Sequence, residues 1–334
     1  MKTRPGSKGA DKAESKSRDA DSPASKNAEP ESWRDFLAPK FWGSWLLIAL
    51  LRVLGALPFK LGLAVGSQFG MLLYHLIKKR RRVTAVNVSL CFPEKTPAQQ
   101  AEFVKEIFRA NGIGFVETAW AYWGSIAAIK KRTTVIGQEV LERALAKNRG
   151  VIVLGAHFSN LDLGGVLISY YGVPVHCMYR THNNPLMDYI IRKKRSRFTS
   201  VIERKKIRQV LRRLRENHCI WYAPDQDFGE KGSVFVPFFG QIAATIVATS
   251  KLVAINDSPM LMVRHQRNAD NSGYTIELTE VANFPTGDET EDARIVNQTI
   301  EQAVRQAPEQ YMWVHKRFKT QPDGRQKLYQ RGGC

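Results

Sequence analysis

Short apolar runs alternate with amphipathic segments through the second half of the chain. β-Branched and apolar runs predict strands at 151–154, 173–178, 218–223, 260–265 and 274–281. Helical periodicity between and after them predicts helices at 160–170, 185–198, 204–217 and 292–306. Strand–helix alternation of this kind predicts an α/β fold: a mixed central sheet flanked by helices.

Two further segments show helical periodicity. The segment 204–217 places Ile207 and Val210 on one face and arginines on the other, so it predicts a surface helix. Residues 98–130 predict a pair of helices, with Phe103 among the positions expected in the core.

The first 78 residues differ from the rest in pattern. Residues 1–32 are polar, with almost no apolar side chains, and predict a disordered tail. Residues 33–78 predict an N-terminal hydrophobic membrane-anchor helix, because 41–58 is apolar except for Arg52. That run is short for a span, which needs about 20 apolar residues. The anchor is therefore either a tilted span or a helix lying in the interface, with a buried core helix as the alternative.

The remaining boundaries follow from these patterns. The cations at 78–82 end the anchor region and predict that the body lies on the cytoplasmic side. Residues 79–325 form the main domain, and 326–334 form a short C-terminal tail.

Positive charge is concentrated in one stretch. The net charge is +19, and residues 180–215 hold thirteen Lys/Arg against two acidic residues. Such a surface attracts nucleic acid, anionic lipid headgroups or an acidic protein. RNA binding is disfavoured, because only Tyr189 and Phe198 are interleaved with these cations. The cysteines form no metal-binding spacing and indicate a reducing compartment.

His157 is the first candidate for catalysis. It follows the strand 151–154 after Gly155, so it stands at the carboxyl end of that strand, where α/β sheets place ligands. Asp162 lies five positions on, in the first turn of the next helix, and can accept the imidazole N–H. The other ring nitrogen is then free to deprotonate a substrate hydroxyl. The alternative is a structural His bonded near a helix start.

Further polar residues are predicted at the same edge of the sheet. Asp225 and Asp227 follow the strand 218–223. They could bind a metal, orient cations or substrate hydroxyls, or simply form a turn. No His or further acid lies nearby in sequence to complete a metal site, so no metal is expected. Other candidates for binding substrate are Arg180, Asn184, Asp188 and Arg204, and the two guanidinium groups among them could bind phosphates.

Several blocks of sequence resemble one enzyme family. The chain is similar to the late acyltransferases of lipid A biosynthesis, the lauroyl/myristoyl transferases of Gram-negative bacteria. The matching blocks, in family order, are RRRVTAVNVSLCFPE (80–94), GAHFSNLDLGG (155–165), RTHNNPLMDYI (180–190), ERKKI (203–207), WYAPDQDFGEKGSVFVPFFG (221–240) and APEQYMWVHKRFKTQPDG (307–324). Two features depart from the family pattern. Asp162 stands where many members carry Glu, and the segment after Phe239 is only loosely similar.

The resemblance implies an acyltransferase domain at 79–325. It implies transfer of an acyl chain from acyl carrier protein to a hydroxyl of a lipid A precursor of the Kdo-lipid type. His157 would act as base and Asp162 would fix its tautomer. Arg180, Asn184, Asp188, Arg204, Asp225 and Asp227 would bind substrate.

The thioester already activates the acyl group, so neither cofactor nor metal is expected. The other expected partner is an anionic membrane surface, at the cytoplasmic face of the bacterial inner membrane, and nucleic acid is not expected. Two alternatives stay open: another lipid acceptor, such as a glycerophospholipid, an ornithine lipid or a mannolipid, or a non-catalytic basic membrane-binding module.

Overall fold

The computed structural model describes residues 32–323 and 327–329. The predicted tail at 1–32 lies almost wholly outside the described residues, as does most of the tail at 326–334. The helices are α1 (Trp42–Leu54), α2 (Phe59–Leu76), α3 (Lys78–Cys91), α4 (Pro97–Trp123), α5 (Ile126–Lys130), α6 (Gln138–Leu145), α7 (Leu161–Ile168), α8 (Pro185–Arg195), α9 (Ile207–Arg215), α10 (Ala248–Asn256) and α11 (Glu289–Arg305).

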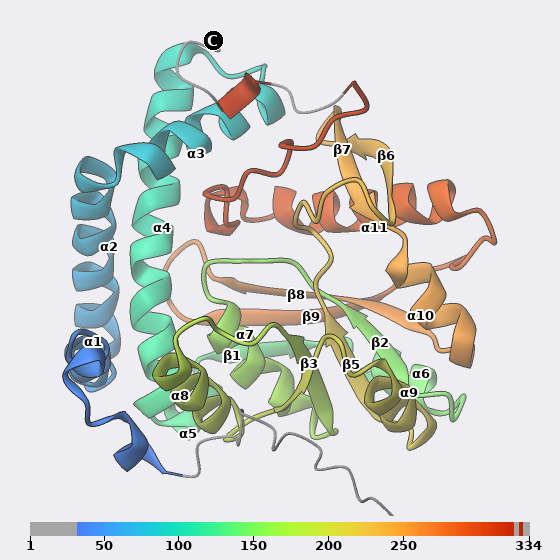
Figure 1. The fold of residues 1–334 in the computed structure, drawn as a ribbon, viewed down its shortest axis with the longest axis horizontal. Helices are drawn as coiled ribbons and strands as arrows, with labels where there is room; N and C mark the ends of the chain where they lie inside the picture. Colours follow the sequence, from blue (N-terminus) through green and yellow to red (C-terminus); the bar gives the residue numbers. More distant parts are fainter. Residues whose placement is uncertain (1–31, 324–326, 330–334) are drawn as a thin grey trace, which may run out of the picture.

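Within the described residues, seven strands form one sheet in the order β1-β9-β8-β2-β5-β3-β4 (Figure 1). The strands are β1 (Thr133–Ile136), β2 (Val151–Leu154), β3 (Val175–Tyr179), β4 (Ser200–Glu203), β5 (Cys219–Tyr222), β8 (Met260–Arg267) and β9 (Tyr274–Glu280). The pairing of β8 with β9 is antiparallel and the other pairings are parallel. A separate antiparallel hairpin joins β6 (Ser233–Phe238) and β7 (Gln241–Ile246).

Alternate side chains of β2 enter two different apolar cores. Ile152 and Leu154 pack into a core that includes residues of α9, α10 and α11. Val151 and Val153 pack into the core that includes α6 and α7. Because a strand projects successive side chains to opposite faces, this division places helices on both faces of the sheet. The predicted mixed sheet flanked by helices is confirmed.

The predicted helix pair at 98–130 is instead one long helix, α4, followed by the short α5. A capping box at Thr96 and Gln99 starts α4. Gly112 does not interrupt it, because α2 packs so closely there that a Cβ on Gly112 would overlap the Gly66 carbonyl oxygen. This glycine therefore permits close helix packing and does not break the helix.

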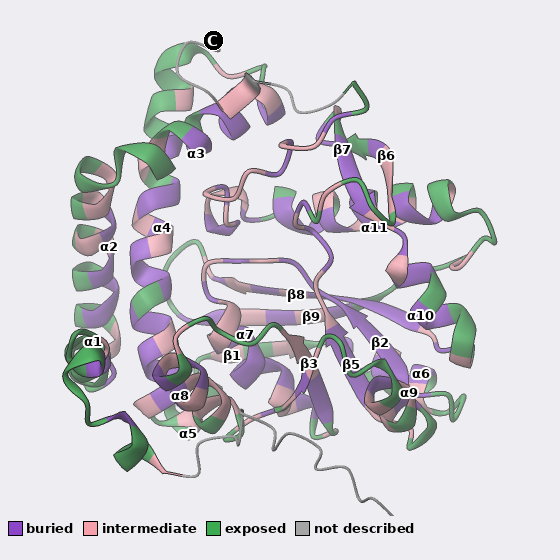
Figure 2. Cartoon of the chain, viewed as in Figure 1, coloured by how far each residue is buried: buried purple, intermediate pink, exposed green. Residues whose placement is uncertain are grey.

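The helices α1 and α2 both pack against α4 at one flank of the molecule. Figure 1 shows α2 alongside α4, and Figure 2 shows that the outer side of α1 and α2 is exposed. The apolar run at 41–58 forms α1, which is 13 residues long. Among the described residues, no helix is both long enough and apolar enough to cross a membrane.

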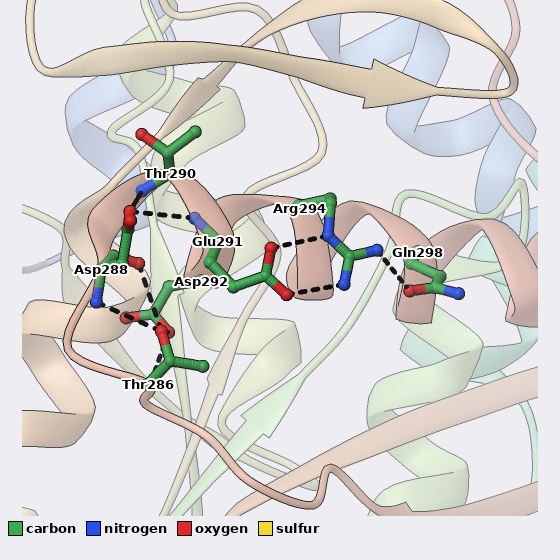
Figure 3. A network of polar contacts seen from close by, with 7 residues as sticks. All are labelled: Thr286, Asp288, Thr290, Glu291, Asp292, Arg294 and Gln298. Atoms are coloured by element: carbon green, nitrogen blue, oxygen red, sulfur yellow. Dashed lines mark hydrogen bonds and ion pairs between the residues drawn. The ribbon is translucent and has the colours of Figure 1, made fainter.

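The start of α11 is one of the helix N-termini that this chain caps with a side chain. Asp288 caps it by accepting from the backbone N–H groups of Thr290 and Glu291 (Figure 3). Asp292 accepts from the backbone and hydroxyl of Thr286 and ties the preceding loop to the first turn. Acidic side chains at this end complement the positive end of the helix dipole.

Candidate active site

The backbone places His157 at the carboxyl end of β2, as its position in the sequence predicts. Two residues earlier, a Cβ at Gly155 would overlap the indole nitrogen of Trp221, so glycine at this position makes room for the Trp221 side chain. The His157 carbonyl accepts from the backbone N–H of Met312, which fixes the loop after the strand. The His157 side chain is 23 % exposed, so it is largely enclosed but still accessible.

Asp225, and not Asp162, is the carboxylate that contacts His157. The Asp225 Oδ1 atom lies 2.6 Å from His157 Nδ1, and Oδ2 accepts from the His157 backbone N–H at 2.9 Å. Tyr311 donates its hydroxyl to Oδ2 at 2.9 Å. The predicted hydrogen bond between His157 and Asp162 is therefore wrong. The reason is topological: β5 pairs directly with β2, so the residues just after each strand meet.

These contacts set the charge states of the pair. Burial lowers the pKa of His157, but the Asp225 carboxylate and its hydrogen bond outweigh burial and raise that pKa above its ordinary value. Burial alone would raise the pKa of Asp225, but His157 and the hydroxyl of Tyr311 bring it down to about 2. Asp225 is thus ionised at neutral pH. With Nδ1 bonded to Asp225, the Nε2 atom of His157 is the one left for proton transfer.

Asp162 has a different partner within the same site. Its Oδ1 atom accepts from Arg195 Nε at 2.7 Å, linking the first turn of α7 to the end of α8. Both side chains are largely buried. Burial lowers the pKa of Arg195, and the Asp162 charge raises it by more, so the guanidinium stays protonated. The pair places a fixed cation beside His157.

A cavity of about 470 Å³ opens next to His157. Part of its lining is apolar, including Leu161, Met178, Phe198 and Trp221. The polar and charged side chains that line it are His157, Asp162, Tyr179, Arg180, Arg195, Thr199, Arg204, Tyr222, Gln226, Asp227 and His315. An apolar chain and an anionic group could therefore both be accommodated beside the histidine.

The other predicted substrate-binding residues are distributed differently. Arg180 and Arg204 line the cavity as expected from their positions after β3 and β4. Asn184 caps α8 and donates to Ser44 of α1, and Asp188 accepts from the backbone of His182. Neither of these two residues lines the cavity.

Asp227 lines the cavity and also organises the loop after β5. It accepts from the backbone and hydroxyl of Thr320 and from the backbone of Gly229. The turn that the sequence left open as an alternative is therefore present, and it is tied to the C-terminal segment. Across the described residues, no group of three or more His, Cys, Asp or Glu is arranged to hold a metal ion.

Three residues of the site were not found from the sequence. Arg195 is one of thirteen similar cations in 180–215, so nothing in the pattern distinguishes it. Tyr311 and His315 lie in the block 307–324, whose resemblance to the acyltransferase family was the available signal. His315 Nε2 accepts from the backbone N–H of Asp227, and burial lowers the His315 pKa, so this ring is neutral.

Comparison with known proteins identifies the family of this chain. Residues 29–320 match the family model for bacterial lipid A biosynthesis acyltransferases. The chain is 37 % identical to a lipid A biosynthesis palmitoleoyltransferase of Escherichia coli K12, over 89 % of this chain and 97 % of that protein. It is 34 % identical to the lauroyltransferase of the same organism, over 86 % and 95 % of the two chains. It is 28 % identical to the myristoyltransferase, over 90 % and 94 %.

Proposed function

Since this chain belongs to the bacterial lipid A biosynthesis acyltransferases, we propose that it transfers a fatty acyl chain from acyl carrier protein to a hydroxyl of a lipid A precursor. The precursor is of the Kdo-lipid type, and the product is an acyloxyacyl ester formed late in assembly. The observation that carries the proposal is His157, held by Asp225 at the wall of a cavity that is both apolar and cationic.

In the proposed reaction His157 is the general base. Its Nε2 atom takes the proton from the acceptor hydroxyl as the oxygen attacks the thioester carbonyl. The new C–O bond forms, the C–S bond breaks, and the proton passes from His157 to the departing thiolate. Asp225 keeps the proton on Nδ1 and stabilises the imidazolium that forms, and Tyr311 orients Asp225. The acyl group arrives activated as a thioester, so the balance requires no further reactant.

Asp162 acts in this proposal through Arg195. The tetrahedral intermediate carries negative charge on the former carbonyl oxygen, and a fixed cation beside the base stabilises that charge. The bond from Asp162 holds the Arg195 side chain, which lines the cavity, in one orientation. Asp162 is thus a positioning residue, and Arg195 is the group that touches the reacting atoms.

The acceptor and the acyl chain use different parts of the cavity. Arg180 and Arg204 bind phosphate or carboxylate groups of the acceptor, since guanidinium groups bind such anions through paired hydrogen bonds. The apolar side, which includes Phe198 and Trp221, takes the acyl chain. Asn184 and Asp188 shape the start of α8 and support Arg195 at its far end.

We place the protein at the cytoplasmic face of the inner membrane, held by the helices α1 and α2. Large apolar side chains stand exposed on these helices: Trp42, Leu46, Leu47, Leu50, Val53, Leu61, Val65, Leu72 and Leu76. A soluble monomer rarely exposes a contiguous apolar surface of this kind. These two helices are therefore proposed to lie in the membrane interface, with their exposed apolar side chains in the lipid.

The direct test is transfer by the purified protein in detergent micelles. We expect mass spectrometry to show one added acyl chain on a Kdo-bearing lipid A precursor when acyl carrier protein supplies the thioester. His157→Ala should lower the rate by about 10²–10⁴-fold without changing the thermal midpoint, because it removes the base. Acylation of a glycerophospholipid with no product from the precursor would reject the proposed acceptor. Near-normal turnover by His157→Ala would reject the mechanism.

A further inference from the structure

A second cavity lies outside the catalytic site, between α3 and the C-terminal segment. Its volume is also about 470 Å³. Its lining consists of Lys78, Lys79, Arg82, Val83, Lys316 and Tyr329. Four of these six are cations and none is acidic. Among the described residues, no carboxylate forms an ion pair with any of the four cations.

The frame around this cavity is built from well-defined contacts. Tyr329 donates its hydroxyl to Asn87 of α3 at 2.6 Å, and its ring lies beneath the Lys316 ammonium group. Asn87 in turn donates to the backbone carbonyls of Trp313 and His315. Arg80 donates to the Val314 carbonyl. Lys316 is thus held opposite α3, with its ammonium group over the Tyr329 ring.

Three of the cations of this cavity stand at the N-terminus of α3, the end of a helix where positive charge is unfavourable. The five residues at 78–82 are all cations, and they begin α3, where the helix dipole is positive. Ile77 provides no side-chain cap, so the first backbone N–H groups have no side-chain acceptor. At α11 the same chain places Asp288 and other acids at this position (Figure 3). The cations and free N–H groups at the start of α3 together favour a bound anion.

The surface beside the cavity indicates where the anion comes from. Leu72, Leu76 and Ile77, at the end of α2, are exposed and lead directly into Lys78. Figure 2 shows exposed residues continuing from the outer side of α2 to α3. When apolar side chains enter the interface of a bilayer, cations next to them reach the depth of the lipid phosphates.

We propose that this cavity binds the phosphate of an anionic phospholipid headgroup while that lipid remains in the bilayer. The inference rests on the proposed function only in that the acceptor is a membrane lipid. The bound headgroup fixes the C-terminal end of α2 against the membrane. Lys316 is adjacent in sequence to His315, which lines the catalytic cavity, so the same contact orients that cavity relative to the lipid surface.

The test is flotation of the full chain with vesicles of two compositions. One contains phosphatidylcholine alone, and the other adds about 30 % phosphatidylglycerol, which supplies the anionic surface that attracts Lys and Arg. The variant is Lys78→Gln/Lys79→Gln/Arg82→Gln. We expect its partition onto the anionic vesicles to fall by roughly tenfold or more, because three cations leave the headgroup site. Binding to the neutral vesicles should not change, because the apolar face is intact.

A matched control removes the same amount of charge elsewhere. Lys131→Gln/Arg143→Gln/Lys147→Gln alters three exposed cations outside the cavity and should keep most of the anionic binding. An equal loss in both triple variants would show a general charge effect and overturn the proposal, as would full binding by the first variant. Lys316→Gln, which leaves α3 unaltered, should reproduce part of the loss, and equal thermal midpoints should show that every variant is folded.

Two further experiments distinguish the possible sources of the bound phosphate. At constant ionic strength, inorganic phosphate should not displace the wild-type protein from anionic vesicles, and displacement would assign the cavity to a free anion. In detergent micelles the first variant should keep the wild-type KM for the lipid A precursor, and a raised KM would assign the cavity to the acceptor. Absence of transferase activity in every variant and in the wild type would refute the proposed function while leaving the vesicle result to stand on its own.

Discussion

At the scale of the residue, the most consequential contact is the one between His157 and Asp225. A histidine alone has a pKa near 6.5 and no preferred tautomer. The buried carboxylate raises the His157 pKa and orients the ring, and Tyr311 holds the carboxylate in turn. Three side chains from different parts of the chain thus make up the proposed base.

We expect Asp225→Asn to change the pH profile as well as the rate. His157 must be deprotonated to act as a base, so activity is lost as the pH falls through its pKa. Without the Asp225 charge that pKa drops, and the acid limb of kcat/KM should move to lower pH. The maximal rate should fall by on the order of 10²–10⁴-fold, because the ring is no longer held in the right tautomer.

The matched control is Asp162→Asn, which alters the other carboxylate of the site. It should lower kcat through Arg195 while moving the acid limb much less, because Asp162 does not contact His157. If the acid limb of the kcat/KM profile moved far in Asp162→Asn and not at all in Asp225→Asn, Asp162 and not Asp225 would be the carboxylate that sets the pKa of His157. The pH dependence of kcat/KM for both variants is the measurement.

Gly165 offers a test of the apolar side of the cavity. A Cβ at this position would lie 2.6 Å from the Phe198 ring, so Gly165→Ala must displace that ring. Both residues line the cavity, and one methylene in a fitted pocket is worth roughly 10–200-fold in discrimination. We expect kcat/KM to fall more for a long-chain acyl donor than for a short-chain one. Gly43→Ala, which meets open space, should alter neither, and equal losses for all chain lengths would place the acyl chain elsewhere.

At the scale of the element, α4 is joined to the sheet by a buried ion pair. Glu117 of α4 accepts from Arg267 of β8 at 2.8 Å, and both side chains are almost wholly enclosed. Glu117→Gln would leave the Arg267 charge buried without its partner. Breaking a buried pair from one side costs about 3–5 kcal/mol, so the free energy of unfolding should fall by about that amount.

Thermal and denaturant unfolding in detergent can check this expectation. Glu102, also on α4, forms ion pairs with Lys105 and Arg109 at the surface, and Glu102→Gln should leave the thermal midpoint almost unchanged. If both substitutions shift the midpoint equally, the ion pair at Glu117 contributes no more than a surface pair does.

Elements with a strong hydrophobic pattern were predictable from the sequence, whereas the edge strands of the sheet and the separate β6–β7 hairpin were not. The apolar run at 151–154 became β2 with the same bounds, because a strand buried on both faces is apolar throughout. The strands β1 and β4 lie at the two edges of the sheet, are only partly buried and gave no such pattern. The hairpin of β6 and β7, which contains Pro237, was likewise not expected.

The candidate site was predictable to the same limited extent. His157 could be found because a strand, a glycine and a histidine are adjacent in sequence. Its partner could not, because Asp225 lies 68 positions away and meets His157 only through the pairing of β2 with β5. Sequence proximity predicted Asp162, which is the nearest carboxylate. In the fold, Asp162 instead accepts a hydrogen bond from Arg195.

At the scale of the whole molecule, the excess of positive charge has more than one proposed use. The outer face of α9 carries Arg208, Arg212 and Arg215, all exposed and away from the catalytic cavity. We expect this face to contact the acidic carrier protein. Changing the three arginines to Glu should raise the KM for the carrier-linked donor by about tenfold or more at low salt, and less as salt screens the contact.

An acyl-coenzyme A donor provides the comparison, because it lacks the carrier protein. The KM for acyl-coenzyme A should change little in the same variant. The measurement is the initial rate with each donor over a series of salt concentrations. Equal losses with both donors would assign α9 to the acceptor or the membrane. No change with either donor would leave α9 as an ordinary solvated face.

The segment that closes the site also constrains when the enzyme can become active during its synthesis. Tyr311 completes the base, His315 lines the catalytic cavity, and Thr320 fixes the loop that carries Asp227. All three follow the last strand of the sheet in sequence, so a ribosome must synthesise the chain through Thr320 before His157 has its surroundings. The helices α1 and α2, proposed to contact the membrane, are made before the strands of the sheet and could meet the bilayer while the rest is still being translated. Attachment to the lipid can therefore precede catalytic competence, and an incomplete chain would reach its substrate as an inactive protein.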